Sequence, residues 1–397
     1  MFPNLSYISN YFFGTPVDNS LAVVQTFGLF LILAFVFAYF MFYSELKWRQ
    51  NEGILSGVKA LGSSPKKEIP RYILILNFLF GFIIGSKLLL LVNRSSSDKI
   101  SDLLLSLDGN LIGGILGAVL LGGGGLYAHL SQKENNKKEI EFPTDYAIEL
   151  TIMCAIAGIA GAKIFAVAEN LEAFYAAPLK TLFSGSGLTI YGGLITAFFV
   201  GYLYMKRKGF QVLPIMDALA PALLVGYMLG RFGCHFSGDG DWGKVNTIEK
   251  TWSFIPDWLW SYRYPHNVVN SARESILMED CGGLISATGN SPIYCRILPE
   301  GVFPTPLYEI LICGLILILI LSIKKRVKTV GLIFFIYLFL TGIERFLIEF
   351  VRVNERYDLL GLGWSFSQWI AIILTLIGFF FCIYFWKKKT DNSEVSI

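Results

Sequence analysis

The sequence predicts an all-α, polytopic transmembrane helical protein with an irregular external head. Of its 397 residues, 54% are hydrophobic and only 16% are charged, whereas soluble domains average about 25% charged residues. The mean hydropathy is +0.56. Apolar segments of roughly 20 residues, the length that crosses a bilayer as a helix, recur along the chain. These observations exclude a soluble globular enzyme, and the small net charge of +3 gives no indication of a nucleic-acid partner.

Nine apolar segments are long enough to span a membrane. They lie near residues 22–43, 72–93, 111–130, 147–168, 187–205, 213–230, 304–323, 329–349 and 364–386. The sixth is the least regular, because it contains Asp217 and Pro221. The first segment lacks the pattern of a cleaved signal peptide and is long enough to remain as an anchor.

The loops between these spans alternate in charge. Basic clusters occur in residues 44–71, 131–146, 206–208, 324–328 and 387–389. All five fall on one side if the nine spans alternate in direction. Because cytoplasmic loops carry an excess of Lys and Arg, we expect the N-terminus outside and the C-terminus in the cytoplasm.

Two parts of the chain resemble each other. IIGSKLLLLV at 83–92 resembles IAGAKIFAVA at 159–168, and LIGGILGAVLLGG at 111–123 resembles IYGGLITAFFVGY at 190–202. One interpretation is a duplicated two-helix unit, since parallel repeats occur in membrane proteins. The other is independent convergence, because close helix packing favours Gly and Ala.

The longest predicted external loop covers residues 231–303 and is rich in Trp, Tyr, Pro and Gly. We expect a small irregular head that lies on the membrane. Cys281 and Cys295 lie within it. In an oxidising external compartment these two cysteines would pair; the alternative is two free thiols.

Six predicted spans carry polar side chains at their outer ends. Arg345, Glu349 and Arg352 are spaced i, i+4 and i+7, so they share one helix face. Charged groups in a bilayer are costly unless they are paired or bind something polar, so we expect a polar cavity open to the outer leaflet. Arginine suits phosphate, which it binds through two parallel donors. The other residues expected at this depth are Lys163, Tyr191, Arg231, Tyr308, Glu309, Ser365, Ser367 and Gln368.

The segment GRFGCHFSGDGDWG at 230–243 follows the sixth span directly. It combines Arg231 with a thiol, an imidazole and two carboxylates among five glycines, which permit tight turns. Cys234, His235, Asp239 and Asp241 are residue types that bind zinc. However, two adjacent ligands are poorly placed for a tetrahedron, so we expect no metal and no cofactor.

This segment resembles the signature of the prolipoprotein diacylglyceryl transferase family. Further motifs resemble the family in the same order, and together they cover most of residues 22–50 and 147–386. They are LTIYGGLI at 188–195, DALAPALLVGYMLGR at 217–231, FPTPLYEI at 303–310, RFLIEFVRVN at 345–354 and SFSQW at 365–369.

The resemblance implies transfer of a diacylglyceryl group from phosphatidylglycerol to the lipobox cysteine of a prolipoprotein, with glycerol phosphate as the leaving group. It implies a multi-pass protein of the bacterial inner membrane whose site faces the outer leaflet. The implied partners are phosphatidylglycerol, lipobox-containing prelipoproteins and membrane lipids. The alternative is a relative that binds or transports phospholipid headgroups without this chemistry.

The resemblance also implies roles for individual residues. Arg231 is expected to bind the donor phosphate, with His235 and Tyr191 as further catalytic residues. The expected substrate-binding residues are Lys163, Gly192, Gly193, Cys234, Ser237, Gly238, Asp239, Tyr308, Glu309, Arg345, Glu349, Arg352 and Gln368.

The chain departs from the family at several of these positions. Tyr191 stands where the family usually has His, Cys234 where it has Asn, and Phe27 where it has Tyr. Asp239 is expected to replace the usual Glu, in a loop one residue longer. His235, which titrates near neutrality, is the candidate for the displaced base, whereas Tyr191 would orient substrate.

The predicted organisation has five parts. Residues 1–146 hold the first three spans, including an apparent two-span addition, and residues 147–230 hold spans four to six of the transferase-like core. Residues 231–303 form the signature loop and the head. Spans seven to nine occupy 304–386, and a cytoplasmic tail covers 387–397.

Overall fold

The computed structural model describes most of the chain outside the predicted second and third spans. The described residues are 1–59, 75, 78, 79, 81, 82, 86, 111, 114–119, 123, 140–169, 171–176, 178, 189–269, 275–278, 281, 284, 294–353 and 363–394. The predicted spans at 72–93 and 111–130 therefore fall mostly outside the described residues, as does Lys87 of the segment 83–92.

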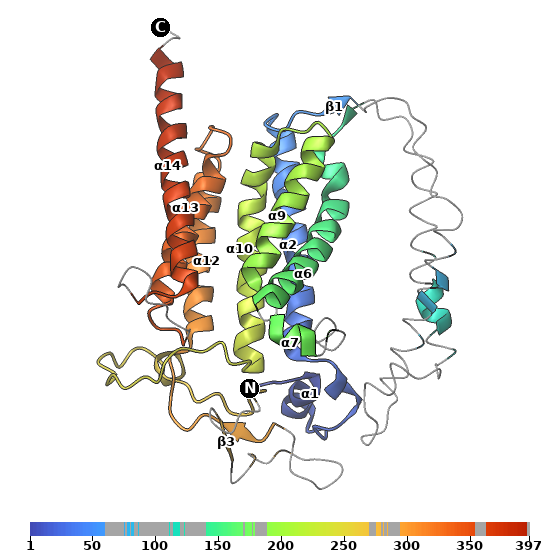
Figure 1. Cartoon of the computed structure of the whole chain (residues 1–397), viewed down its shortest axis with the longest axis vertical. Helices are drawn as coiled ribbons and strands as arrows, with labels where there is room; N and C mark the ends of the chain where they lie inside the picture. Colours follow the sequence, from blue (N-terminus) through green and yellow to red (C-terminus); the bar gives the residue numbers. More distant parts are fainter. Residues whose placement is uncertain are drawn as a thin grey trace.

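The other seven predicted spans coincide with helices (Figure 1). These are α2 (Thr26–Asn51), α6 (Ala147–Glu169), α9 (Ile190–Arg207), α10 (Val212–Ser237), α12 (Thr305–Ile323), α13 (Leu332–Ile348) and α14 (Phe366–Glu394). Within the part of the chain that the structure describes, α2, α6, α10, α12 and α14 are long and apolar enough to cross a membrane. The protein is a polytopic helical membrane protein.

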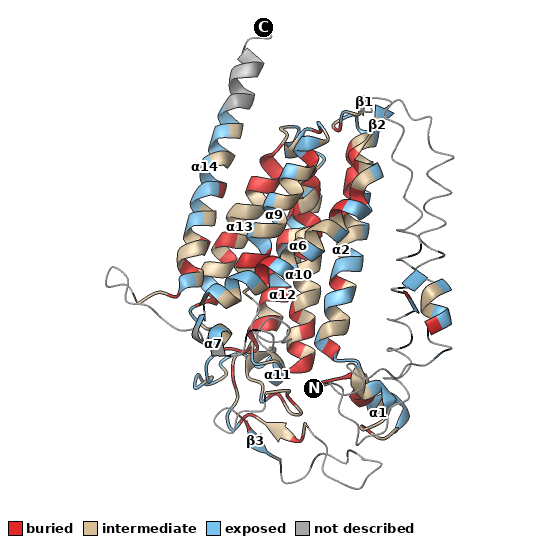
Figure 2. Cartoon of the chain, turned by 45° about the vertical axis from the view of Figure 1, so that its right-hand side comes forward, coloured by how far each residue is buried: buried red, intermediate tan, exposed pale blue. Residues whose placement is uncertain are grey.

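Helix α10 occupies the centre of the bundle. It packs against α2, α12 and α13, while α14 packs on α13, and α6 joins α9 to α2. One buried cluster includes Leu46, Met205 and Ala218, and a second includes Leu224 and Ile333. Exposed and half-buried residues follow most of α14 (Figure 2), as expected for an apolar helix that faces lipid.

Helices α6 and α9 approach each other through small residues. Gly158 faces the backbone of Gly193, and a Cβ atom added to Gly161 would lie 2.3 Å from the Thr196 hydroxyl. Such contacts allow helix backbones to pack closely in a membrane. Gly81 and Gly117 make a similar backbone contact. Glycine contacts in both units fit a duplicated unit and also fit convergent packing.

Helix α10 is longer than the sequence predicts. We expected the sixth span to end at residue 230, but the helix continues to Ser237, so the first part of the signature is helical and not a loop. Gly233 lies in this extension, where a Cβ atom would come within 2.9 Å of Phe30 of α2. Gly238 ends the helix at φ 64°, and its N–H bonds to the Cys234 carbonyl at 3.0 Å.

The head lies at the end of the bundle where α10 terminates (Figure 1). It contains α11 (Asp257–Trp260) and the antiparallel strands β3 (Ile276–Leu277) and β4 (Arg296–Ile297). Its core is Trp242, Tyr264, Leu298 and Val302. The predicted pairing of Cys281 with Cys295 is confirmed as a disulfide. The N-terminal helix α1 (Leu5–Phe13) lies beside the head, where the Tyr7 ring contacts His266 and Tyr294.

The remaining short elements connect the helices. A 3-10 turn η1 (Ser20–Val23) precedes α2, and α7 (Leu171–Ala176) follows α6. At the end opposite the head, β1 (Val58–Lys59) pairs antiparallel with β2 (Ile140–Glu141), which leads into η2 (Pro143–Tyr146). This pairing brings together the two ends of the long segment between α2 and α6.

Asp217 joins α10 to α13 at the end of the bundle opposite the head. Its two carboxylate oxygens accept hydrogen bonds from the backbone N–H groups of Gly331, at 2.7 Å, and Phe334, at 2.8 Å. Arg49 of α2 lies 3.8 Å from the same carboxylate. The two N–H groups lie at the start of α13, where free N–H groups favour a negative charge. Asp217, the residue that makes the sixth predicted span irregular, is therefore buried and hydrogen-bonded.

We expect Asp217→Ala to lower the free energy of unfolding by about 3–5 kcal/mol, because it leaves the buried Arg49 without its partner. Asp217→Asn should cost less, since the amide oxygen still accepts one backbone hydrogen bond. Denaturation with sodium dodecyl sulfate in mixed micelles measures both. Asp257→Ala is the control, because that carboxylate is 93% exposed and exposed pairs contribute little. Equal stability of the Asp217→Ala and Asp257→Ala variants would contradict this role.

Candidate functional site

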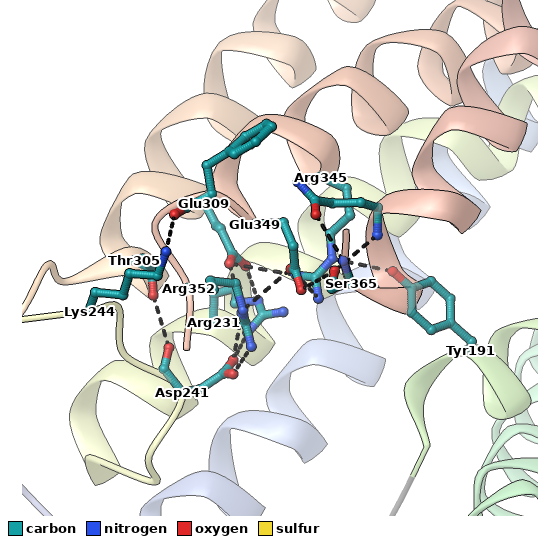
Figure 3. A network of polar contacts seen from close by, with 12 residues as sticks. Tyr191, Arg231, Asp241, Lys244, Thr305, Glu309, Arg345, Glu349, Arg352 and Ser365 are labelled. Carbon is teal, nitrogen blue, oxygen red and sulfur yellow. Dashed lines mark hydrogen bonds and ion pairs between the residues drawn. The ribbon is translucent and has the colours of Figure 1, made fainter. Parts of the chain in front are cut away.

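Three arginines and three carboxylates form one network at the head end of the bundle (Figure 3). The arginines come from two regions: α10 supplies one, and the end of α13 supplies the other two. The carboxylates come from α12, from the end of α13 and from the loop after α10. The members are Arg231, Arg345, Arg352, Asp241, Glu309 and Glu349.

Glu309 of α12 is the central acceptor of this network, and its side chain is 0% exposed. It pairs with the Arg231 Nε atom, lies 2.9 Å from Arg352 Nη1 and lies 3.8 Å from Arg345 Nη1. The Tyr227 hydroxyl donates at 2.5 Å to Oε2, the oxygen that also pairs with Arg231. A carboxylate this deeply buried is tolerated only when it is paired and hydrogen-bonded, so Glu309 holds the three arginines together.

Asp241 connects Arg231 and Arg352 on the more exposed side of the network. It pairs with one nitrogen of Arg231 and with both terminal nitrogens of Arg352, one of them at 3.2 Å. This bidentate contact is the strong form of arginine–carboxylate pairing. The Thr305 hydroxyl donates to the Asp241 carbonyl at 3.0 Å. The loop therefore presents its carboxylate at a fixed backbone position.

The third side of the network reaches α9 and α14. Arg345 Nη2 lies 3.5 Å from Glu349 within α13, and Arg345 Nε donates to the Tyr191 hydroxyl at 3.3 Å. Ser365 donates to Glu349 at 2.8 Å. Ser365 and Gln368 also exchange hydrogen bonds as a capping box at the start of α14. The cap therefore fixes the hydroxyl that contacts Glu349.

Two further side chains set the electrostatics behind this network. The Arg231 guanidinium lies 4.9 Å from the centre of the Tyr227 ring, a distance at which the ring face attracts a cation. Glu344 of α13 is buried, and its Oε1 atom has no hydrogen-bond partner among the described residues. Glu344 adds no positive charge, and the three arginines are matched by three carboxylates. The network therefore has no excess of positive charge.

The rim of the site contains the other chemical groups of the signature. His235 lies one turn beyond Arg231 on α10, and its Nδ1 atom is 3.2 Å from the Tyr264 hydroxyl. Its ring packs against Phe236 and Tyr262. Burial raises the pKa of the Asp239 carboxyl.

Several predicted substrate-binding residues fix the structure around the network. Gly192 faces Phe165 of α6, and Gly193 faces Gly158, so both glycines lie at the α6–α9 contact and not in the arginine network. The physical reason is that only glycine permits this close approach. Tyr308 donates to the Leu259 carbonyl at 2.8 Å and so joins α12 to the head.

The remaining predicted residues lie at two places. Lys163 is half-buried. It lies near the start of α9, because the carbonyl of the neighbouring Ala162 accepts a hydrogen bond from the Thr189 N–H at 3.1 Å. Ser237 and Gly238 end α10, where the Ser237 hydroxyl donates to the Cys234 carbonyl at 3.3 Å.

Sequence reasoning missed Asp241 as a member of the network and gave Asp239 the place of the family's Glu. In the structure Asp241 is the carboxylate of this loop that pairs with Arg231 and Arg352, whereas the expected role of Asp239 stays a prediction. The available signal was position, since Asp241 directly precedes Trp242 and Gly243. Tyr227 and Thr305 gave no such signal.

The described residues contain no group of three or more His, Cys, Asp or Glu side chains arranged to hold a metal ion. The site itself offers guanidinium groups, carboxylates, phenols and an imidazole. Clustered guanidinium groups suit a phosphate, to which they can donate several charge-assisted hydrogen bonds.

A family model described as prolipoprotein diacylglyceryl transferase matches residues 115–384. The chain is also similar to proteins named phosphatidylglycerol–prolipoprotein diacylglyceryl transferase. The relative in Dehalococcoides mccartyi is 26% identical, covering 66% of this chain and 85% of the relative. The Leptospira interrogans relative is 26% identical, covering 67% and 87%. The Streptococcus pneumoniae relative is 28% identical, covering 66% and 86%.

Proposed function

The chain belongs to the prolipoprotein diacylglyceryl transferase family, and we propose that its arginine–carboxylate network is the active site. The enzyme transfers a diacylglyceryl group from phosphatidylglycerol to a prolipoprotein. The observation that carries the site assignment is the convergence of Arg231, Arg345 and Arg352 at the head end of one helical bundle. A transporter of headgroups is not favoured.

Transfer of the diacylglyceryl group requires two contributions from the protein. The cysteine sulfur attacks the glyceryl carbon that carries the phosphate, the carbon–oxygen bond breaks, and glycerol phosphate leaves. Because the thiolate is the nucleophile, a group must take the thiol proton. Because negative charge develops on the departing phosphate, fixed donors must stabilise it. The three arginines supply those donors, and Arg231 is the proposed principal ligand.

Arg231→Lys should abolish or nearly abolish transfer while the protein still inserts and folds. Lysine keeps the charge but loses the planar fork that contacts Glu309 and Asp241 together. The assay uses purified protein, labelled phosphatidylglycerol and a lipobox peptide. Arg326→Lys is the matched control, because Arg326 is exposed at the opposite end of the bundle. Retention of most activity by Arg231→Lys would remove Arg231 from phosphate binding.

His235 is the proposed proton acceptor. It lies on the same face of α10 as Arg231, one turn farther toward the head. A thiol of pKa about 8.5 is only slightly ionised at neutral pH, and a general base contributes roughly 10²–10⁴-fold. Tyr191, which contacts Arg345, would orient substrate by hydrogen bonding.

His235→Gln should therefore lower turnover by about 10²-fold or more, and the loss should exceed that of Tyr191→Phe. Since only the neutral imidazole accepts a proton, the wild-type rate should fall as pH decreases, and the variant should lose this acidic limb. Steady-state pH–rate profiles of both variants measure the effect. A larger loss in Tyr191→Phe, or an acidic limb that survives in His235→Gln, would assign the base elsewhere.

The proposed setting is the bacterial inner membrane, with nine spans, the head outside and the C-terminus in the cytoplasm. The charge of the loops supports it, because basic clusters lie at 206–208 and 324–328. The network then lies at the level of the outer-leaflet headgroups.

A membrane-impermeant maleimide tests this orientation. Glu249→Cys in the head should be labelled in intact spheroplasts, and Lys325→Cys at the other end should be labelled only after lysis. Both positions are exposed. The chain without an added cysteine gives the background from Cys154, Cys234, Cys313 and Cys382. Labelling of Lys325→Cys from outside would overturn the orientation.

A further inference from the structure

Asp241 differs from the other two carboxylates of the network in its exposure. Its side chain is 24% exposed, whereas Glu309 is 0% and Glu349 is 1% exposed. It is also the one that comes from a loop, while the other two lie on or at the end of helices. A molecule that approaches the arginines from the open side would therefore meet Asp241 first.

The contacts of Asp241 use the same donors that a phosphate would need. Its two oxygens pair with Arg231 and with both terminal nitrogens of Arg352. Phosphate and carboxylate are the two anions whose oxygens match the guanidinium fork. Both cannot use these donors at the same time, so binding of a phosphate requires Asp241 to release them.

The backbone around Asp241 allows this release without movement of the loop. The Asp241 N–H donates to Asp239 Oδ1 at 3.2 Å, and its carbonyl accepts from Thr305 at 3.0 Å. On the following side, Trp242 is buried in the head core. Rotation of the Asp241 side chain breaks only its ion pairs, whereas withdrawal of Glu309 would leave a buried charge unpaired.

We propose that Asp241 is an internal competitor of the substrate phosphate. It pairs with Arg231 and Arg352, yields them to the phosphate of the glycerophospho group, and returns to displace glycerol phosphate after transfer. The sequence of transfer and product displacement rests on the proposed function, whereas the competition itself concerns only anion binding. Asp241 is thus a positioning residue that keeps the arginines aligned and speeds product release.

Competition by Asp241 predicts the direction in which the affinity for a phosphate changes. If Asp241 holds the arginines nine-tenths of the time, the apparent affinity for a phosphate is lowered about tenfold, because only the released state binds it. Asp241→Asn removes the competing charge and keeps the size of the side chain. It should bind glycerol phosphate about tenfold more tightly. A residue that served only to hold the arginines in place would give the opposite change.

The experiment uses the full chain in nanodiscs. Isothermal titration with sn-glycerol 1-phosphate gives its Kd for the wild type, Asp241→Asn and Asp241→Glu. Competition by phosphatidylglycerol, in discs with and without this lipid, tests the phosphodiester of the donor against the free phosphomonoester. Asp257→Asn is the matched control, since its carboxylate is exposed and paired with Lys250 on the head surface. Transfer assays then give the inhibition constant of glycerol phosphate.

The proposal expects tighter binding of both phosphates and stronger product inhibition in Asp241→Asn, and wild-type values in Asp257→Asn. Asp241→Glu keeps the competing charge and should bind neither phosphate more tightly than the wild type does. Unchanged or weaker glycerol phosphate binding in Asp241→Asn overturns it, and tightening for the free phosphate alone overturns competition with the donor. If Asp241→Asn does not fold, Asp241→Ser, which also removes the competing charge, is measured in its place with the same expected and contradicting results. Tighter binding without any wild-type transfer would uphold the competition and refute the proposed reaction.

Discussion

The cost of placing three guanidinium groups at the end of a membrane bundle constrains the rest of this structure. Unpaired charges in that position are expensive, so each arginine is surrounded by carboxylates. Glu309 contacts all three and is completely buried. Because its partners come from α10 and from the end of α13, the pairing fixes the relative positions of α10, α12 and α13.

Helix α10 is held at both of its ends by charge. Toward the head, Arg231 pairs with Glu309 and Asp241. At the other end, Asp217 accepts hydrogen bonds from the start of α13 and pairs with Arg49. Between these two ends α10 packs in two apolar clusters, so the depth of Arg231 in the bundle follows from the two polar clusters that the helix connects. A bundle held by packing alone would allow the helices to slide along one another.

The same pairing that stabilises the arginines also neutralises them. A phosphate is attracted by a local excess of positive charge, and in this network that excess arises only when a carboxylate changes its partner. Glu309 and Glu349 are buried and hydrogen-bonded to Tyr227 and Ser365, so they are fixed. Asp241 is the partner whose exchange costs least. Stability and substrate binding therefore depend on the same guanidinium donors. This is expected of a site whose charged groups are already in position before the substrate binds.

The sequence by itself predicted the membrane class, the seven long apolar helices among those that the structure describes and the Cys281–Cys295 pair, because apolar length and cysteine context are local properties. It also predicted Arg231, Glu309 and the Arg345–Glu349–Arg352 face, since helical spacing reports which residues share a side. The nine-span count and the orientation stay predictions. Only the tertiary structure decided that Asp241 completes the network, that Gly192 and Gly193 face α6, and that α10 continues to Ser237. Each of these depends on which distant residues pack against a segment, and that information is absent from local spacing.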